Sequence, residues 1–153
     1  MKNVNEFLLG ACYYPEHWEE NDYIEDVKSI KAMGFNVVRM GEFSWSMFEK
    51  NEGEYDFSYL AKVVSACRDE GLSVILGTPT AAPPIWLPEK YPEILCADDT
   101  GCKIPHGSRQ HHNHTREVYL DYVKKIVRKM GEAFLEFSDT VIGRQINIFR
   151  NLL

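Results

Sequence analysis

The chain has 153 residues, of which 44% are hydrophobic and 26% charged, a composition that indicates a folded domain rather than a disordered segment. Its formal net charge is −6, and no cluster of Lys and Arg alternates with aromatic residues, so nucleic acid is not an expected partner. No apolar run reaches the roughly 18–20 residues that span a bilayer, so no membrane partner is expected either. The apolar stretch near the N-terminus is too short for a signal peptide, and four scattered cysteines favour a reducing cytoplasm.

Strands and helices are predicted to alternate along the chain. Short apolar runs predict four strands, at residues 7–14, 35–41, 72–79 and 140–146. Apolar residues at helical spacing predict three helices between them, at residues 22–33, 58–70 and 115–130. Ser58 and Thr115 are expected to cap the second and third helices. The segment from residue 80 to residue 114 is rich in Pro and Gly and is predicted to be a long loop.

This alternation indicates an α/β fold with parallel strands and helical crossovers. Two closures are possible, an open doubly wound sheet or a (β/α)8 barrel. The turn after the first strand, Tyr14-Pro15-Glu16-His17-Trp18, lacks the glycines of a nucleotide-binding sheet, which favours the barrel. Bulky polar and aromatic groups follow the strands, as in barrel enzymes. Four βα units are half a barrel, so either further strands are missing or this is a four-strand fold with long loops.

The ends of the first two strands carry candidate functional side chains. Glu42 follows the second strand and lies three residues before Trp45, a pairing that suits acid/base chemistry or substrate binding. The structural alternative is an ion pair between Arg39 and Glu42. After the first strand, Glu16-His17-Trp18 could face a polar ligand, or Trp18 could simply pack on the next helix.

The loop after the third strand, Thr78 to Trp86, is stiffened by proline and ends in an aromatic residue. A rigid loop that presents the Trp86 indole suits sugar stacking, although a purely structural loop fits equally well.

Further along the same loop, histidines are crowded around one arginine. His106, Arg109, His111, His112 and His114 fall within nine positions, with Cys96 and Cys102 upstream. The cysteine spacing lacks the close pair of structural zinc sites, and the adjacent His111 and His112 are expected to point apart on an extended chain. No metal site is therefore predicted. Arg109 has a planar, five-donor side chain that suits contacts to hydroxyl groups.

Four of these motifs together resemble one known family. They are GACYYPEHW, RMGEFSWSMFEKNEGEYDFSYL, GTPTAAPPIWLPEKYPEIL and GSRQHHNHT, and they are similar to the N-terminal part of the glycoside hydrolase family 42 β-galactosidases. The resemblance runs from about residue 8 to residue 147. It implies a (β/α)8 catalytic barrel, of which residues 1–153 supply about the first four βα units, an incomplete domain. It also implies hydrolysis of terminal β-D-galactosides with retention, with no cofactor, in enzymes that are often homo-oligomers.

The resemblance assigns roles to individual residues. Arg109, in GSRQHH, matches the arginine of the family that contacts galactose. With Glu42, Trp45 and Trp86 from the strand ends, it makes up the expected substrate-binding set. Where the fourth strand of the family ends in Gln-x-Asp-Asn-Glu, this chain reads Gln145-Ile146-Asn147-Ile148-Phe149.

Because of this difference at residues 147–149, the catalytic acid/base of the family is not expected in this chain. The Glu of the family motif is the general acid/base, and phenylalanine at position 149 cannot transfer a proton. The nucleophile lies on a later strand that these 153 residues do not contain, so no catalytic residue is expected here. Some family members bind structural zinc through cysteines, one of which matches Asn113 in this chain, so that site is not expected either.

Three hypotheses follow. The chain is a β-galactosidase fragment that is inactive alone, or a non-catalytic galactoside-binding or interaction module, or a small metal-binding protein. In the module, Arg109 and the three tryptophans, Trp18, Trp45 and Trp86, would contact the sugar. In a half-barrel the first and fourth strands would be unpaired edges, which predicts an aggregation-prone monomer or a dimer that pairs two halves.

Overall fold

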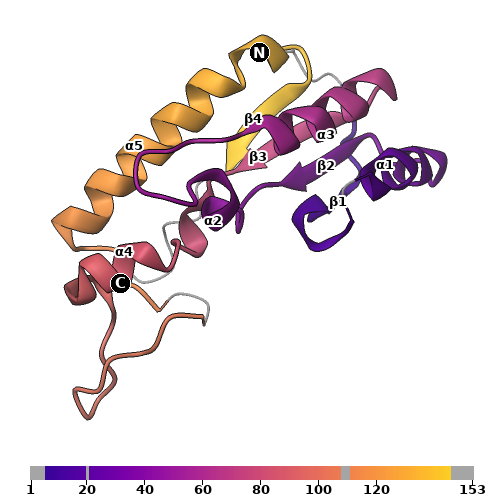
Figure 1. Ribbon diagram of the computed structural model, residues 1–153. Coiled ribbons are helices and arrows are strands. Elements are labelled where there is room, and N and C mark those ends of the chain that lie inside the picture. Colours follow the sequence, from indigo (N-terminus) through magenta and orange to yellow (C-terminus); the bar gives the residue numbers. More distant parts are fainter. Residues whose placement is uncertain (1–5, 20, 108–110, 146–153) are drawn as a thin grey trace. The chain divides into compact units, whose positions relative to one another are not determined.

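The computed structural model of the chain describes residues 6–19, 21–107 and 111–145 (Figure 1). The described chain divides into two compact units. The sheet unit contains the described residues up to Gly41, residues 57–77 and residues 131–145. The loop unit contains residues 42–56 and the described residues of 78–130. No helix in the described ranges is long and apolar enough to cross a membrane.

The sheet unit is built on four parallel strands in sequential order (Figure 1). These are β1 (Gly10–Cys12), β2 (Val37–Met40), β3 (Ser73–Gly77) and β4 (Val141–Gln145). β1 pairs with β2, β2 with β3, and β3 with β4, each in parallel. The predicted strands and their parallel pairing are therefore confirmed, although each strand is shorter than its apolar run.

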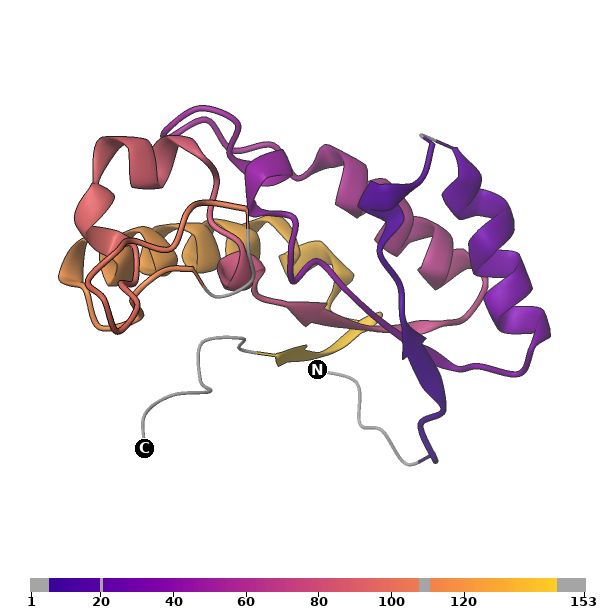
Figure 2. The ribbon, with the colours of Figure 1, turned by 90° about the horizontal axis from the view of Figure 1, so that it is seen from below.

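The positions of two crossover helices distinguish an open doubly wound sheet from a (β/α)8 barrel. α1 (Asp22–Ala32) and α3 (Ser58–Asp69) pack against each other and lie on the same side of the sheet (Figure 2). A doubly wound sheet reverses its strand order and places helices on both faces, whereas a (β/α)8 barrel keeps sequential order with its helices outside. The sheet unit has the barrel pattern, so the α/β fold is that of a partial (β/α)8 barrel.

The two faces of the sheet differ in burial. Val38 and Met40 on β2 pair in register with Val74 and Leu76 on β3, and all four side chains are fully buried. The residues between them on the opposite face include Arg39 and Ile75, which remain partly exposed. Since side chains alternate across a strand, one face forms the packed layer and the other is less covered.

The loop unit has more regular structure than predicted. It holds α2 (Trp45–Phe48), α4 (Trp86–Lys90) and most of α5 (Glu117–Ala133). Short 3-10 turns occur at Pro79–Ala81 and Pro92–Ile94, and isolated bridges join Leu95 to His112 and Ala97 to Lys103. The long loop predicted from residue 80 to residue 114 contains the short helix α4 and a 3-10 turn, because proline interrupts long helices but is favoured in the first turn of a helix.

The predicted apolar faces of α3 and α5 are confirmed, but that of α1 is only partly right, because Val27 is buried while Ile24 and Met33 are exposed. The predicted caps are not confirmed. α5 buries Tyr119, Tyr122, Val123, Ile126 and Met130, all members of the predicted apolar face. α3 begins at Ser58, with Phe57 in the N-cap position and no side-chain cap. The Thr115 hydroxyl donates to Asn113 Oδ1 at 2.7 Å, and α5 begins only at Glu117. Thr115 therefore stabilises the turn before the helix rather than its first N–H groups.

Candidate functional site

The first candidate segment follows β2. Gly41 has a φ of 95°, a left-handed conformation that glycine adopts at little cost, and it connects β2 to Glu42. Glu42 is buried, and α2 begins three residues later at Trp45. The candidate carboxylate is thus held on a short turn between a strand and a helix.

The indole of Trp45 is held by a hydrogen bond to Glu49, which was not among the predicted site residues. Its indole Nε1 donates to Glu49 Oε2 at 2.8 Å, and both side chains are fully buried. The other oxygen of that carboxylate, Oε1, accepts from the backbone N–H of Gly53 at 2.9 Å. Trp45 also packs on Tyr119, with ring centroids 6.2 Å apart. Burial leaves the Trp45 indole no surface for a sugar, so any part it has in a sugar site is through positioning.

Trp86 is also hydrogen-bonded to Glu49. Its indole Nε1 donates to the backbone carbonyl of Glu49 at 3.0 Å. Its ring meets Tyr122 edge-on at a centroid distance of 5.4 Å. Unlike Trp45, Trp86 keeps part of its side chain exposed. Glu49 therefore binds both predicted tryptophans, one through its carboxylate and one through its carbonyl, and the four-residue spacing from Trp45 was the available sequence signal.

A polar cluster lies beside Trp86 in the loop unit. The Tyr122 hydroxyl and the Lys90 ammonium both donate to the carboxylate of Glu52. These two hydrogen bonds, Lys90 first, hold the pKa of Glu52 below its usual value. The hydroxyl groups of Tyr91 and Tyr122 form a hydrogen bond of 3.3 Å, and the Lys125 Nζ atom lies 4.3 Å from the centre of the Tyr122 ring. The cluster ties residue 52 to α4 and α5, a structural rather than a catalytic arrangement.

Four of the crowded histidines come together in the loop unit. The ring centroids of His106 and His111 lie 4.7 Å apart, those of His111 and His112 5.4 Å, and those of His112 and His114 4.6 Å. His112 packs at 4.5 Å on Tyr119, whose hydroxyl donates to the Thr80 carbonyl. The prediction that His111 and His112 point apart was wrong, because both rings turn into one buried cluster between His106 and Tyr119.

Burial controls the charge of this cluster. Desolvation, with the nearby His114 and His111, lowers the pKa of His112 to about 3. Desolvation also lowers the pKa values of His106 and His114 below that of a free histidine. Burial raises the pKa of Tyr119. His106, His112 and His114 are therefore neutral at physiological pH and pack as polar aromatic rings.

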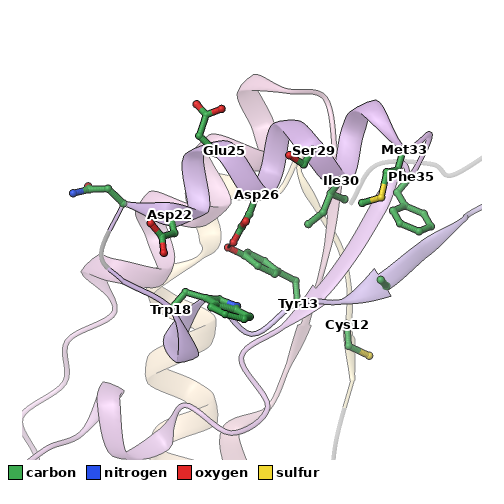
Figure 3. Close-up of a pocket in the computed structure, with 12 residues that line it drawn as sticks. Cys12, Tyr13, Trp18, Asp22, Glu25, Asp26, Ser29, Ile30, Met33 and Phe35 are labelled. Atoms are coloured by element: carbon green, nitrogen blue, oxygen red, sulfur yellow. Dashed lines mark hydrogen bonds between the residues drawn. The ribbon is translucent and has the colours of Figure 1, made fainter.

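In the sheet unit, the segment after β1 forms a 3-10 turn at Pro15–His17. The Tyr59 hydroxyl on α3 donates to the Pro15 carbonyl at 2.9 Å, which fixes the turn. Trp18 follows it and lines a cavity of about 590 Å³ between β1 and α1 (Figure 3). Although Trp18 lies alongside α1, its side chain is 62% exposed.

The remaining predicted site residues lie outside the described ranges. Arg109, the predicted galactose contact, and Asn147, Ile148 and Phe149, at the position of the acid/base motif, are among them. β4, which leads to that motif, is described to Gln145.

The described residues do not fit a metal centre. Within the described ranges, no group of three or more His, Cys, Asp and Glu side chains is placed to hold a metal ion. Asn113, at the position of a family zinc ligand, uses its amide oxygen to accept from the backbone N–H and the hydroxyl of Thr115. An amide oxygen engaged in this way does not replace a cysteine thiolate in a zinc site.

Comparison with known proteins identifies close relatives. The glycoside hydrolase family 42 profile, described as β-galactosidase, matches residues 12–147. A β-galactosidase of Thermus thermophilus is 39% identical over 127 residues, which cover 83% of this chain and 20% of the relative. The β-galactosidase YesZ of Bacillus licheniformis is 41% identical over 80% of this chain and 19% of its own length.

Solved structures agree with these sequence relatives. The β-galactosidase of the psychrophilic Marinomonas ef1 superposes with a TM-score of 0.86 at 37% identity, over 92% of this chain and 21% of that one. The enzyme of the haloarchaeon Halorubrum lacusprofundi gives a TM-score of 0.85 at 36% identity, with the same coverage. The chain spans about a fifth of the length of the relatives it matches. It belongs to glycoside hydrolase family 42, the β-galactosidase family, and corresponds to an N-terminal portion of its (β/α)8 barrel.

Proposed function

We propose that residues 1–153 form the N-terminal half of the catalytic barrel of a retaining β-galactosidase, a hydrolase of terminal β-D-galactosides in carbohydrate metabolism. One coincidence carries the proposal. The family profile matches residues 12–147, and residues 10–145, nearly the same stretch, hold four parallel strands in sequential order. A (β/α)8 barrel requires eight such strands.

The 153-residue chain alone is proposed to be inactive. Retaining hydrolysis requires two carboxylates about 5–5.5 Å apart, one as acid/base and one as nucleophile. Phenylalanine occupies the acid/base position, 149, and the nucleophile position falls outside this sequence. Loss of a general acid/base by itself removes roughly 10²–10⁴ in rate.

The proposed contribution of this half is recognition of galactose. Arg109 would contact sugar hydroxyls with its planar set of donors. Glu42 and the partly exposed Trp86 are the next candidates, and Trp45 would act by positioning its neighbours. No cofactor is proposed. A cytoplasmic location is proposed on the four scattered cysteines alone.

Assay of the purified 153-residue chain on a chromogenic β-D-galactoside tests this function. Hydrolysis should not exceed the uncatalysed background, while a full-length relative under the same conditions turns the substrate over. Turnover by the chain would contradict the proposal, because it would require an acid/base and a nucleophile within these residues.

A galactose titration followed by NMR tests the competing function of a galactoside-binding module. The variants are Arg109→Ala and, as a matched control, Arg116→Ala at an exposed position. We expect no saturable binding by any of the three chains. Binding that is lost in Arg109→Ala and kept in Arg116→Ala would favour the module over the barrel half.

A further inference from the structure

One buried tyrosine contacts three of the segments that carry the predicted site. Tyr119 lies in the first turn of α5, and its side chain is fully buried. Its ring packs on Trp45, in the segment after β2, with ring centroids 6.2 Å apart. The same ring lies 4.5 Å from His112 and 5.9 Å from His114, between centroids, in the histidine segment. Its hydroxyl donates to the Thr80 carbonyl, in the turn after β3. All of these contacts lie within the loop unit.

The turn after β3 lies where a barrel places its functional groups. Pro79–Ala81 starts two residues beyond the end of β3, and Thr80 within it is fully buried. Active sites of (β/α)8 barrels lie at the carboxyl ends of the strands, where this turn and the Glu42 segment after β2 both belong. The same turn begins the loop that ends in Trp86. A bond to the Thr80 backbone therefore fixes the start of a loop that carries a predicted sugar contact.

The hydroxyl of Tyr119 has a different acceptor from that of Tyr122, its neighbour on α5. Both side chains are buried, and both hydroxyls donate to an oxygen atom from a distant part of the chain. The acceptor of Tyr122 is the Glu52 carboxylate, in the structural cluster beside Trp86, whereas the acceptor of Tyr119 is the backbone of the turn after β3. Burial raises the pKa of Tyr119, so its hydroxyl keeps its proton and remains a donor at physiological pH.

We propose that Tyr119 is a positioning residue for galactoside binding: its hydroxyl holds the turn after β3, which leads to Trp86, and its ring holds Trp45. Tyr119 itself touches no sugar, because its side chain is fully buried. It acts through the groups that it holds in place. The inference rests on the proposed function, since it assigns a role in the same site.

Kinetics of a complete barrel test the effect on the substrate. A chimera carries residues 12–145 of this chain in place of the matching segment of the Thermus thermophilus β-galactosidase. In the chimera, Tyr119→Phe removes the hydroxyl and keeps the ring, and Tyr122→Phe is the matched control on the same helix. We expect Tyr119→Phe to raise KM for a chromogenic β-D-galactoside about tenfold with kcat unchanged, because misplaced binding groups weaken the substrate complex. Tyr122→Phe should leave both constants unchanged.

A purely structural role of Tyr119 gives a different kinetic result. Loss of folded enzyme lowers the apparent kcat and leaves KM as it was. That outcome, or an equal rise of KM in the two variants, would overturn the proposal. An unmodified chimera without activity would contradict the proposed function, and hydrogen exchange in the 153-residue chain then decides the inference.

Amide hydrogen exchange of the full 153-residue chain tests the positioning without a substrate. Tyr119→Phe should speed exchange at the amides of residues 80–82 about tenfold or more, because the turn loses the bond that ties it to α5. Tyr122→Phe should leave exchange at these amides unchanged. Unaltered exchange in Tyr119→Phe, or the same acceleration in Tyr122→Phe, would show that the Tyr119 hydroxyl does not hold the turn and would overturn the proposal.

Discussion

The indole of Trp45 donates to the carboxylate of Glu49 at 2.8 Å inside the loop unit, where neither side chain is exposed. A buried carboxylate is stable only where donors surround it. Here they include the Trp45 indole, the Gly53 backbone N–H and the Tyr55 hydroxyl. Burial and the charge of Glu49 raise the pKa of Tyr55 to about 12, so that hydroxyl keeps its proton as a donor. Glu49 therefore organises the segment that carries both candidate tryptophans.

Glu49→Gln should destabilise the chain by roughly 1–3 kcal/mol, because the amide group of glutamine turns a donor toward groups that are themselves donors. Urea denaturation followed by circular dichroism measures this loss. Glu93→Gln, at an exposed position in the same unit, is the control and should change the unfolding free energy little. Equal effects of the two substitutions would show that Glu49 has no special structural role.

Gly10→Ala should destabilise the sheet unit. A β-carbon at this position would lie 1.9 Å from the Val37 carbonyl oxygen on β2, far closer than atoms can approach. Relief requires β1 to shift against β2, at a cost of about 1–3 kcal/mol. Gly143→Ala on β4 is the matched control, since the nearest atom to its β-carbon in the described residues would be Ile75 Cγ1, at an ordinary 3.9 Å. Thermal melting of both variants measures the difference, and a Gly10→Ala melting point equal to that of Gly143→Ala would refute the close approach.

The chain should lose stability in acid through its histidine cluster. The pKa of His112 in the folded chain is about 3, below the usual 6.5. Above pH 6.5 both folded and unfolded chains hold this histidine neutral. As the pH falls from 6.5 toward 3, the unfolded chain takes up the proton and the folded chain does not, so stability declines. For one such histidine the loss between pH 7 and pH 5 is about 2 kcal/mol.

His112→Gln should remove that part of the pH dependence, which urea denaturation at pH 7 and pH 5 measures. The variant loses less stability between the two values than the unmodified chain does, whatever its stability at pH 7. His17→Gln, at an exposed histidine, should leave the difference unchanged. An unaltered difference in His112→Gln would mean that His112 is not held neutral by burial.

Local patterns in the sequence predicted the parts of the fold that depend on them. The spacing of Leu60, Val63, Val64 and Cys67 predicted α3 and its buried face, and a continuous apolar run predicted β3. The order of the strands and the barrel pattern followed from the same alternation. The family resemblance named from four motifs is confirmed by the comparisons.

Features that depend on distant contacts were not predictable from local sequence. α4 is only five residues long, and it is held by bonds such as that between the Trp86 indole and the Glu49 carbonyl, 37 residues apart. Apart from its four-residue spacing from Trp45, nothing in the local sequence distinguishes Glu49 from an exposed glutamate. The histidine cluster likewise depends on the bridge between Leu95 and His112, which brings residue 112 back beside the 3-10 turn at residues 92–94. The substrate-binding role of Arg109 stays a prediction.

A segment exchange tests the central claim most directly. Residues 12–145 of this chain would replace the matching segment of the Thermus thermophilus β-galactosidase, and the family resemblance places the acid/base and nucleophile outside the exchanged part. We predict a folded chimera that hydrolyses a chromogenic β-D-galactoside, and that loses this activity on Arg109→Ala but not on Arg116→Ala. A chimera that melts cooperatively yet shows no hydrolysis would contradict the claim that this chain is a β-galactosidase barrel half.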